Sequence, residues 1–289
     1  MKRSRTKPSA IDSERLLSLV GKFAGIRVAV FGDLLADEFI YGQISRVSRE
    51  APVLILEYDS SEIVPGGAGN AANNVAALGG SATAIGVAGD DETGQRLLDV
   101  LAPRVDVRGV VRPAGYRTPT KTRILAGGIH SAKQQVVRID RAARPTLTDA
   151  DRHNVEVKLI AAAAICDALL VSDYGTGLVT PDVVSHAQRR FKGPGRRQPP
   201  VLVDSRYSLL RYHGMTTCTP NESEVEHLFG IKIGEDLKLL DISLAEAGRR
   251  KVERFRDRAP AAYRGAERIR EGDVFAVGKE GLHRPWISS

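Results

Sequence analysis

The chain has 289 residues and a formal net charge of +7, from 42 Lys and Arg against 35 Asp and Glu. A hydrophobic content of 42% with 27% charged residues is typical of a globular protein and excludes a disordered or fibrous chain. The sequence contains no run of about 18 apolar residues, which excludes a membrane-spanning helix.

The positive charge is confined to two segments. Residues 1–10 contribute +4 and residues 249–271 contribute +5, so the rest of the chain is slightly acidic. A nucleic-acid surface requires a basic stripe interleaved with aromatic residues, and none occurs, so we expect no nucleic-acid partner. Cys166 and Cys218 lie in apolar stretches and are expected to be reduced core residues. With no secretory signal in the first residues, we expect a cytoplasmic protein without a membrane partner.

The chain begins with a helical pattern over residues 12–23 and an apolar strand over residues 26–31. Two later segments, at about 38–64 and 105–140, alternate polar and β-branched or aromatic residues with period two. Such alternation predicts strands with one covered face. We expect these two inserts to form a small β lid.

Strands then alternate with helices. The patterns predict strands at 82–88, 168–172, 201–204 and 216–219, and helices at 93–101, 149–165, 181–191 and from Pro220 onward. This alternation predicts an α/β fold of three layers, a mostly parallel central sheet with helices on both faces. Ligands of such sheets lie beyond the carboxyl ends of the strands, so we expect the loops after Phe31, Ser172, Asp204 and Thr219 to line a site.

The segment from Pro65 to Gly79 is rich in glycine, alanine and asparagine. Gly66 and Gly67 would let the backbone turn tightly beside a ligand, and the Asn70 amide could donate to and accept from hydroxyls. Two alternatives stay open. The spacing of Gly67, Gly69 and Ala72, with Asp90 further on, also fits a loose dinucleotide fingerprint, and the glycines could be purely structural.

Carboxylates follow two of the predicted strands. Asp33 and Asp37 lie at and just beyond the first strand, where ionised carboxylates could accept hydrogen bonds from a polyol, although they could equally cap a turn. Asp173 follows a buried strand and precedes Gly175 and Gly177, two glycines in three residues, which implies a close approach of the backbone to another group.

The last motif runs from Thr219 to Glu224. Pro220 suits a helix start, and a helix amino terminus is a natural seat for phosphate. Glu224 could hold Mg²⁺ through water. The alternative is a capping box, with Asn221 or Thr219 as the cap and Glu224 as its partner. The sequence contains no Walker A motif and no histidine or cysteine cluster with metal-ligand spacing.

Taken in order over residues 12–250, these segments resemble the ribokinase-like (PfkB) carbohydrate kinases. The likeness is greatest to the heptose-7-phosphate kinase domain of bifunctional ADP-heptose synthases. Its members in this sequence are Gly32–Asp37, Arg46–Val53, Pro65–Gly79, Lys121–Arg123, Arg138–Asp140, Ser172–Gly175, Asp204–Arg206 and Thr219–Glu224.

The resemblance implies transfer of the γ-phosphoryl group of ATP to a sugar hydroxyl, here the C1 hydroxyl of heptose 7-phosphate. Two sets of residues would serve that reaction. The candidate sugar-phosphate ligands are Asp33, Asp37, Gly66, Gly67, Asn70, Lys121, Arg123 and Asp173, of which Lys121 and Arg123 would lie near the existing phosphate. The candidate ligands of ATP and Mg²⁺ are Asp204, Thr219, Asn221 and Glu224. The lid would also pair two subunits into a homodimer.

The sequence departs from the family after Glu224. Family members carry a Gly-any-Gly-Asp segment whose Asp takes the proton from the attacking hydroxyl, and no such segment follows Glu224 here. We therefore expect a single ribokinase-like domain over residues 1–289, divergent from about 251, with an incomplete core at its carboxyl end and weak or no turnover. A non-catalytic sugar-phosphate binder and an NAD-dependent oxidoreductase are the alternatives.

Overall fold

The computed structural model describes residues 13–127, 133–142, 147–190, 198–221 and 223–224. Residues 1–219 form one unit and residues 220–289 a second. The predicted divergence from about 251 lies outside the described residues. None of the helices in these described ranges is long and apolar enough to cross a membrane.

The first unit is built on a six-stranded sheet in the order β10-β9-β8-β1-β4-β5, and every neighbouring pair runs parallel. Its strands are β1 (Arg27–Gly32), β4 (Ser81–Val87), β5 (Val105–Val111), β8 (Ala168–Asp173), β9 (Val201–Ser205) and β10 (Thr217–Cys218). Val30 and Phe31 of β1 are fully buried, because a central parallel strand is covered on both faces.

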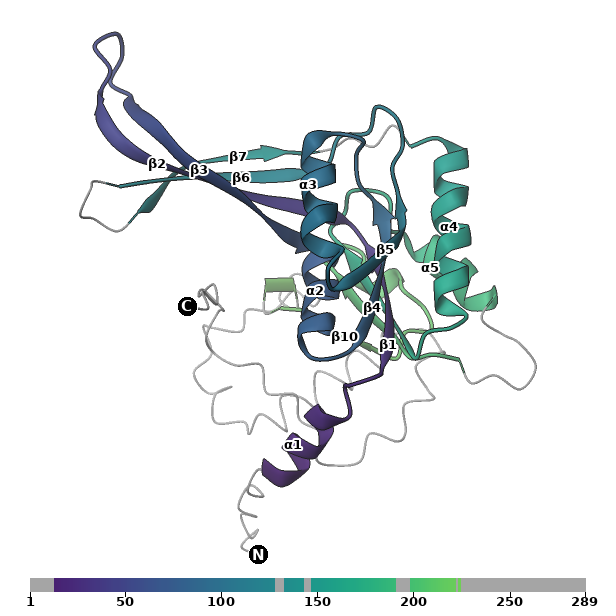
Figure 1. Ribbon diagram of the computed structural model, residues 1–289. Coiled ribbons are helices and arrows are strands. Elements are labelled where there is room, and N and C mark those ends of the chain that lie inside the picture. The colour runs from purple at the N-terminus through teal and green to yellow at the C-terminus, as the bar shows by residue number, and fades with distance from the viewer. Residues whose placement is uncertain (1–12, 128–132, 143–146, 191–197, 222, 225–289) are drawn as a thin grey trace, which may run out of the picture. The chain divides into compact units, whose positions relative to one another are not determined.

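Helices cover both faces of this sheet, which confirms the predicted three layers. α2 (Ala68–Ala77) and α3 (Glu92–Leu101) lie on one face, and α4 (Asp149–Ala163) and α5 (Pro181–Arg190) lie on the other (Figure 1). Each helix buries residues three or four apart, as Val155 and Leu159 do in α4. α1 (Ser13–Gly21) precedes β1, and a short 3₁₀ helix, η1 (Leu209–Arg211), follows β9.

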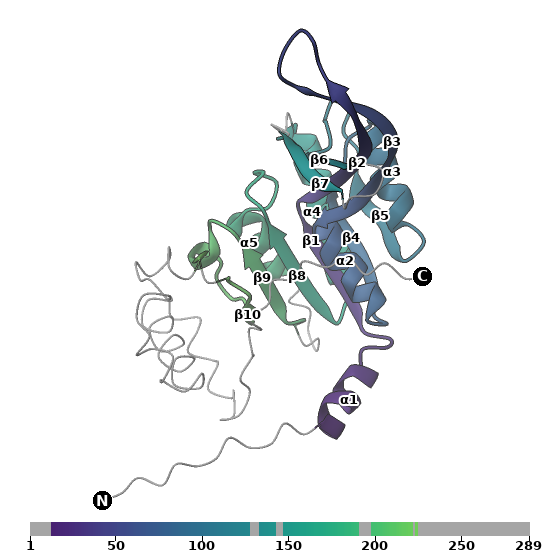
Figure 2. The same cartoon turned by 90° about the vertical axis from the view of Figure 1, so that its left-hand side faces the viewer.

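A second sheet forms the lid, in the order β3-β2-β6-β7. Its strands are β2 (Leu34–Val47), β3 (Leu54–Gly67), β6 (Thr120–Gly127) and β7 (Gln134–Arg141). The hairpin of β2 and β3 extends well beyond the main sheet in both views (Figures 1 and 2).

The predicted boundary of the second lid insert, 105–140, was wrong at its start. Residues 105–111 are β5, which pairs in parallel with β4 in the main sheet and buries Val105 and Val111. Period-two alternation is the same for an edge strand of the main sheet and for a lid strand, so the pattern alone could not separate them.

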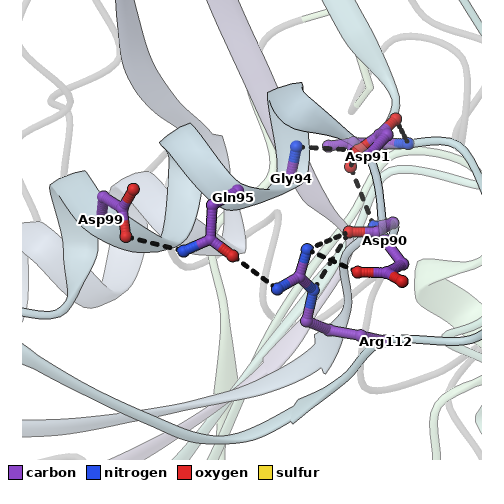
Figure 3. Close-up of polar contacts among 8 residues, drawn as sticks. Asp90, Asp91, Gly94, Gln95, Asp99 and Arg112 are labelled. Carbon is purple, nitrogen blue, oxygen red and sulfur yellow. Dashed lines mark hydrogen bonds and ion pairs between the residues drawn. The ribbon is translucent and has the colours of Figure 1, made fainter.

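A polar cluster after β4 fixes where the lid strand β6 begins (Figure 3). Asp91 caps α3 by accepting from the Gly94 amide at 2.8 Å, and the same carboxylate accepts from the Thr118 hydroxyl at 2.7 Å and the Thr118 amide at 3.0 Å. Burial raises the pKa of Asp91, but the hydrogen bonds from Thr118 and Gly94 outweigh it and lower that pKa overall. Thr118 lies two residues before β6, so the start of that strand is tied to α3.

Candidate functional site

The site is organised around the carboxyl ends of β1 and β8, which are neighbours in the sheet. From β1 the chain proceeds to β4 and β5 on one side, whereas β9 and β10 follow β8 on the other. Such a reversal of strand order marks the position at which ligands of α/β sheets generally bind. Asp33 is the single residue between β1 and β2, and its amide donates to the Ser172 carbonyl at 3.0 Å.

Asp33 is a buried carboxylate, only 2% exposed. It accepts three hydrogen bonds from the turn after β8: from the Thr176 hydroxyl at 2.5 Å, the Tyr174 amide at 2.8 Å and the Thr176 amide at 3.3 Å. Burial raises the pKa of Asp33, these hydrogen bonds oppose the rise, and the nearby charge of Asp173 adds to it. The turn therefore stabilises the ionised form of a carboxylate that burial alone would favour protonated.

Asp173, the last residue of β8, is also buried and holds the neighbouring loops together. It accepts from the Ser205 hydroxyl at 2.7 Å, the Tyr212 hydroxyl at 2.8 Å and the Gly175 amide at 3.0 Å. Burial, together with donation to Asp173, raises the pKa of Tyr212 well above its usual range. Both oxygens of Asp173 thus bind protein groups, and its role as a sugar ligand stays a prediction.

The glycine segment brings the end of β3 against Asp33 and Asp37. Gly67 has a φ of +57°, and the next amide, that of Ala68, donates to the Asp33 carbonyl at 3.0 Å. A Cβ on Gly66 would lie 2.5 Å from Oδ2 of Asp37. The close approach that the sequence predicted at these glycines is therefore made to the protein's own aspartates.

Asn70 lies on the first turn of α2 and is exposed. Among the described residues its side chain has no hydrogen-bond partner, so the amide is available to a ligand. Its predicted contact with a sugar is not tested by the structure.

The dinucleotide alternative does not fit this geometry. A dinucleotide fingerprint joins a parallel strand of the main sheet to a helix. Here Gly67 is the last residue of β3, an antiparallel lid strand paired with β2. Asp90, the candidate ribose ligand, instead pairs with Arg112 at 3.1 Å (Figure 3).

The lid contributes charged residues next to this edge. Arg123 of β6 pairs with Asp37 of β2 at 2.6 Å, and its guanidinium lies 5.2 Å from the centre of the Phe39 ring. Nζ of Lys121 lies 5.6 Å from the centre of the Tyr174 ring, in the turn that binds Asp33. Lys121 forms no ion pair within 4.0 Å among the described residues, whereas Arg123 is held by Asp37.

The predicted ATP ligands fall into two groups. Asp204 lies in β9 opposite Ser172 of β8, and Thr219 follows β10 and donates its amide to the Val203 carbonyl at 3.3 Å. Both are at the carboxyl edge of the main sheet, as the sequence predicted.

Asn221 and Glu224 belong to the second unit and bind each other. The Asn221 amide donates to Oε2 of Glu224 at 2.9 Å, and the Glu224 amide donates to Oδ1 of Asn221 at 2.9 Å. This is the capping box that the sequence left open as an alternative. In the described part of the chain, no three His, Cys, Asp or Glu side chains gather as a metal site. Oε1 of Glu224 is not used by the cap, and a single carboxylate that completes its shell with water and phosphate suits Mg²⁺.

Sequence reasoning missed Thr176, Ser205 and Tyr212. The first two lie inside the motifs that were singled out, but nothing in their spacing pairs them with Asp33 or Asp173. Only the order of the strands, with β8 between β1 and β9, brings these hydroxyls to the carboxylates.

A comparison with protein families matches residues 27–252 to the pfkB family of carbohydrate kinases. Among curated proteins, the bifunctional protein HldE of Geobacter sulfurreducens is 34% identical over 277 residues, which cover 95% of this chain and 53% of that protein. The HldE of Pelobacter propionicus is 38% identical over 225 residues, covering 77% and 44%. The chain thus spans about half the length of the curated relatives it matches.

Solved structures are similar in fold. The ribokinase of Arabidopsis thaliana, complexed with ribose and ATP, aligns with a TM-score of 0.53 at 15% identity, covering 82% of this chain and 70% of that one. The tetrameric inhibited form of phosphofructokinase-2 from Escherichia coli aligns with a TM-score of 0.52 at 19% identity, covering 78% and 71%. At these identities the likeness concerns the fold alone.

Proposed function

The chain belongs to the pfkB family of carbohydrate kinases, and from this we propose that its first unit binds a phosphorylated sugar where β1 and β8 end. The proposed sugar is heptose 7-phosphate, and the proposed reaction is transfer of the γ-phosphoryl group of ATP to its C1 hydroxyl. The HldE relatives and the order of motifs support this choice of substrate.

One observation carries the proposal: residues from separate elements meet at one edge of the sheet. Asp33 contacts the backbone of the glycine segment, Gly66 lies against Asp37, and Asp37 pairs with Arg123. Lys121 reaches the same turn that binds Asp33. Hydroxyl acceptors and cations are thereby joined in one continuous set of contacts.

This set suits a sugar that already carries a phosphate. Ionised Asp33 and Asp37 are acceptors for sugar hydroxyls, and a lysine ammonium is a point charge that binds phosphate. Lys121 is the better candidate for the phosphate, because the guanidinium of Arg123 is already bound to Asp37 and orients it. Asn70 and the backbone at Gly67 would complete the sugar contacts.

We assign Asp204, Thr219, Asn221 and Glu224 to ATP and Mg²⁺. ATP supplies the phosphoryl group, and Mg²⁺ neutralises charge on its phosphates. Glu224 would bind the ion through water with the oxygen that its capping box leaves unused.

Turnover is a separate matter from binding. No Gly-any-Gly-Asp segment occurs between Glu224 and Ser289, and a general base typically contributes 10²- to 10⁴-fold to rate. We therefore propose that this chain has weak or no kinase turnover. The same observation favours a second candidate function, sugar-phosphate binding without catalysis.

The proposed partner is a second copy of the chain, bound through the lid. Strand β7 is at the edge of the lid sheet, and all eight of its residues are exposed, including Val137 and Ile139. An exposed edge strand with apolar side chains readily pairs with another chain. These features support the homodimer that the resemblance implies.

Isothermal titration calorimetry of the full chain with heptose 7-phosphate, and with the same heptose lacking phosphate, tests the binding site. We expect the wild type to prefer the phosphorylated sugar and Lys121→Met to lose that preference by ~10- to 100-fold, as for a lost charge-assisted contact. Lys158→Met, on α4 outside the lid, is the matched control. If neither sugar binds the wild type, or if both lysine variants behave alike, the proposed site is wrong; ADP release in the same samples separates a kinase from a binder.

A further inference from the structure

The turn after β8 presents three consecutive backbone amides to Asp33 and Asp173. The amides of Tyr174 and Thr176 donate to Asp33, and the amide between them, that of Gly175, donates to Asp173. Gly175 makes this possible because its φ is +79° and because a Cβ there would meet the Tyr207 ring at 2.7 Å. Successive amides arranged in this way form an anion-binding concavity, here filled by the protein's own carboxylates.

The Thr176 side chain adds the shortest of these contacts. Its hydroxyl donates to Oδ1 of Asp33 at 2.5 Å, while Oδ2 receives the two amides. A carboxylate has about four acceptor sites, so these three donors leave one on Oδ1. That remaining site therefore lies on Oδ1, the same atom that the Thr176 hydroxyl holds in place.

We propose that Thr176 is a positioning residue for the sugar site: its hydroxyl fixes Asp33 so that the remaining acceptor site on Oδ1 binds a sugar hydroxyl. The inference rests on the proposed function, because it takes Asp33 as a sugar ligand. Thr176 itself does not need to touch the sugar. It acts through Asp33, whose burial leaves almost no solvent to replace a lost donor.

The same hydrogen bond also affects how readily Asp33 is ionised. Burial favours the protonated carboxyl, and donation from the Thr176 hydroxyl lowers the pKa of Asp33 against that effect. Among the described residues, three other titratable groups interact electrostatically with Asp33: Asp173 at the end of β8, Tyr116 in the loop before β6 and Tyr212 after η1. Substitution at Thr176 leaves all three in place, so a change in the titration of Asp33 would report on the hydroxyl.

Thr176→Val removes the hydroxyl and keeps the shape and the amide, and Thr176→Ser keeps the hydroxyl. We expect Thr176→Val to bind heptose 7-phosphate ~tenfold more weakly than wild type at neutral pH, because Asp33 is no longer held in place, and more weakly still at acidic pH, because Asp33 would protonate at a higher pH than in the wild type. The affinity of Thr176→Ser for heptose 7-phosphate should follow that of the wild type at every pH. Thr176→Ala provides a second hydroxyl-free variant if the valine disturbs the turn, and circular dichroism verifies folding of each.

The Asp33 carboxyl is titrated directly by carbon-13 NMR of the ligand-free full chain, with Asp33→Asn to assign the signal. A higher pKa in Thr176→Val and Thr176→Ala than in wild type and Thr176→Ser supports the inference whether or not any sugar binds. An unchanged titration of Asp33, or an affinity of Thr176→Val within about twofold of wild type at every pH, overturns the inference. If the pKa of Asp33 shifts but heptose 7-phosphate does not bind the wild type, the proposed substrate is wrong, and Thr176 positions a carboxylate that serves another function.

Discussion

Replacing Gly67 by alanine tests the junction at which the glycine segment meets Asp33. Gly67 has a φ of +57°, and a Cβ there would lie closer than 3.0 Å to the Asp33 carbonyl oxygen, which is backbone and cannot swing aside. That same oxygen accepts the amide of Ala68 at 3.0 Å, so moving it away would also break the first bond of the turn into α2.

The expected cost has two parts. A non-glycine residue at such a φ costs about 1–3 kcal/mol, and loss of the bond from Ala68 to Asp33 costs about 1 kcal/mol. Gly67→Ala should therefore lower the free energy of unfolding by about 2–4 kcal/mol. Gly25→Ala is the matched control, because Gly25 has a φ of +82° but no atom within 4 Å of its would-be Cβ.

Urea denaturation followed by circular dichroism gives the free energy of unfolding of both variants. Gly25→Ala should lower the free energy of unfolding only by the cost of the backbone conformation, and Gly67→Ala should lower it by more. If the two variants lose the same stability, Asp33 and the glycine segment are not in the close contact described. Sugar binding by any Gly67→Ala protein that folds should also weaken, because Asp33 would have moved.

Two further predictions concern the cap of α3 and the lid. The pKa of Asp91 is lowered from 3.8 in the folded chain. The Asp91 carboxylate therefore stabilises the folded chain at pH values above its pKa in the unfolded chain, and this stabilisation is lost as the pH falls through its pKa in the folded chain. Asp91→Asn should thus be less stable than wild type at about pH 7, with the difference shrinking towards about pH 3; Asp99→Asn, on the same helix, is the control, and a pH-independent difference would contradict the argument. In the lid, the double variant Val137→Lys and Ile139→Lys should weaken the proposed homodimer at least ~tenfold by sedimentation, whereas Val157→Lys on α4 should not; a monomeric wild type at micromolar concentration would rule the dimer out.

The order of strands and helices was predictable from the sequence because each pattern is local. The apolar run at residues 26–31 became β1, and the helical pattern at 149–165 became α4. The lid boundary at 105 was wrong, because β5 and the lid strands share the same alternation.

The candidate site was predicted less completely. Asp33, Gly66 and Gly67 were singled out from their position after strands, and the structure brings them together. The donors that hold the carboxylates were missed, because Thr176 is 143 residues from Asp33 in the chain and Tyr212 is 39 from Asp173. Local spacing carries no information about contacts of that range.

The sequence by itself determined the family and the alternation of elements, and it predicted the edge of the sheet at which we propose that ligands bind, since periodicity and motif order are properties of neighbouring residues. Only the tertiary structure decided what the motifs contact. Placing β8 beside β1 turned the glycine-containing turn after β8 into a cradle for Asp33, because parallel strands bring their carboxyl ends, and the loops that follow them, to one edge.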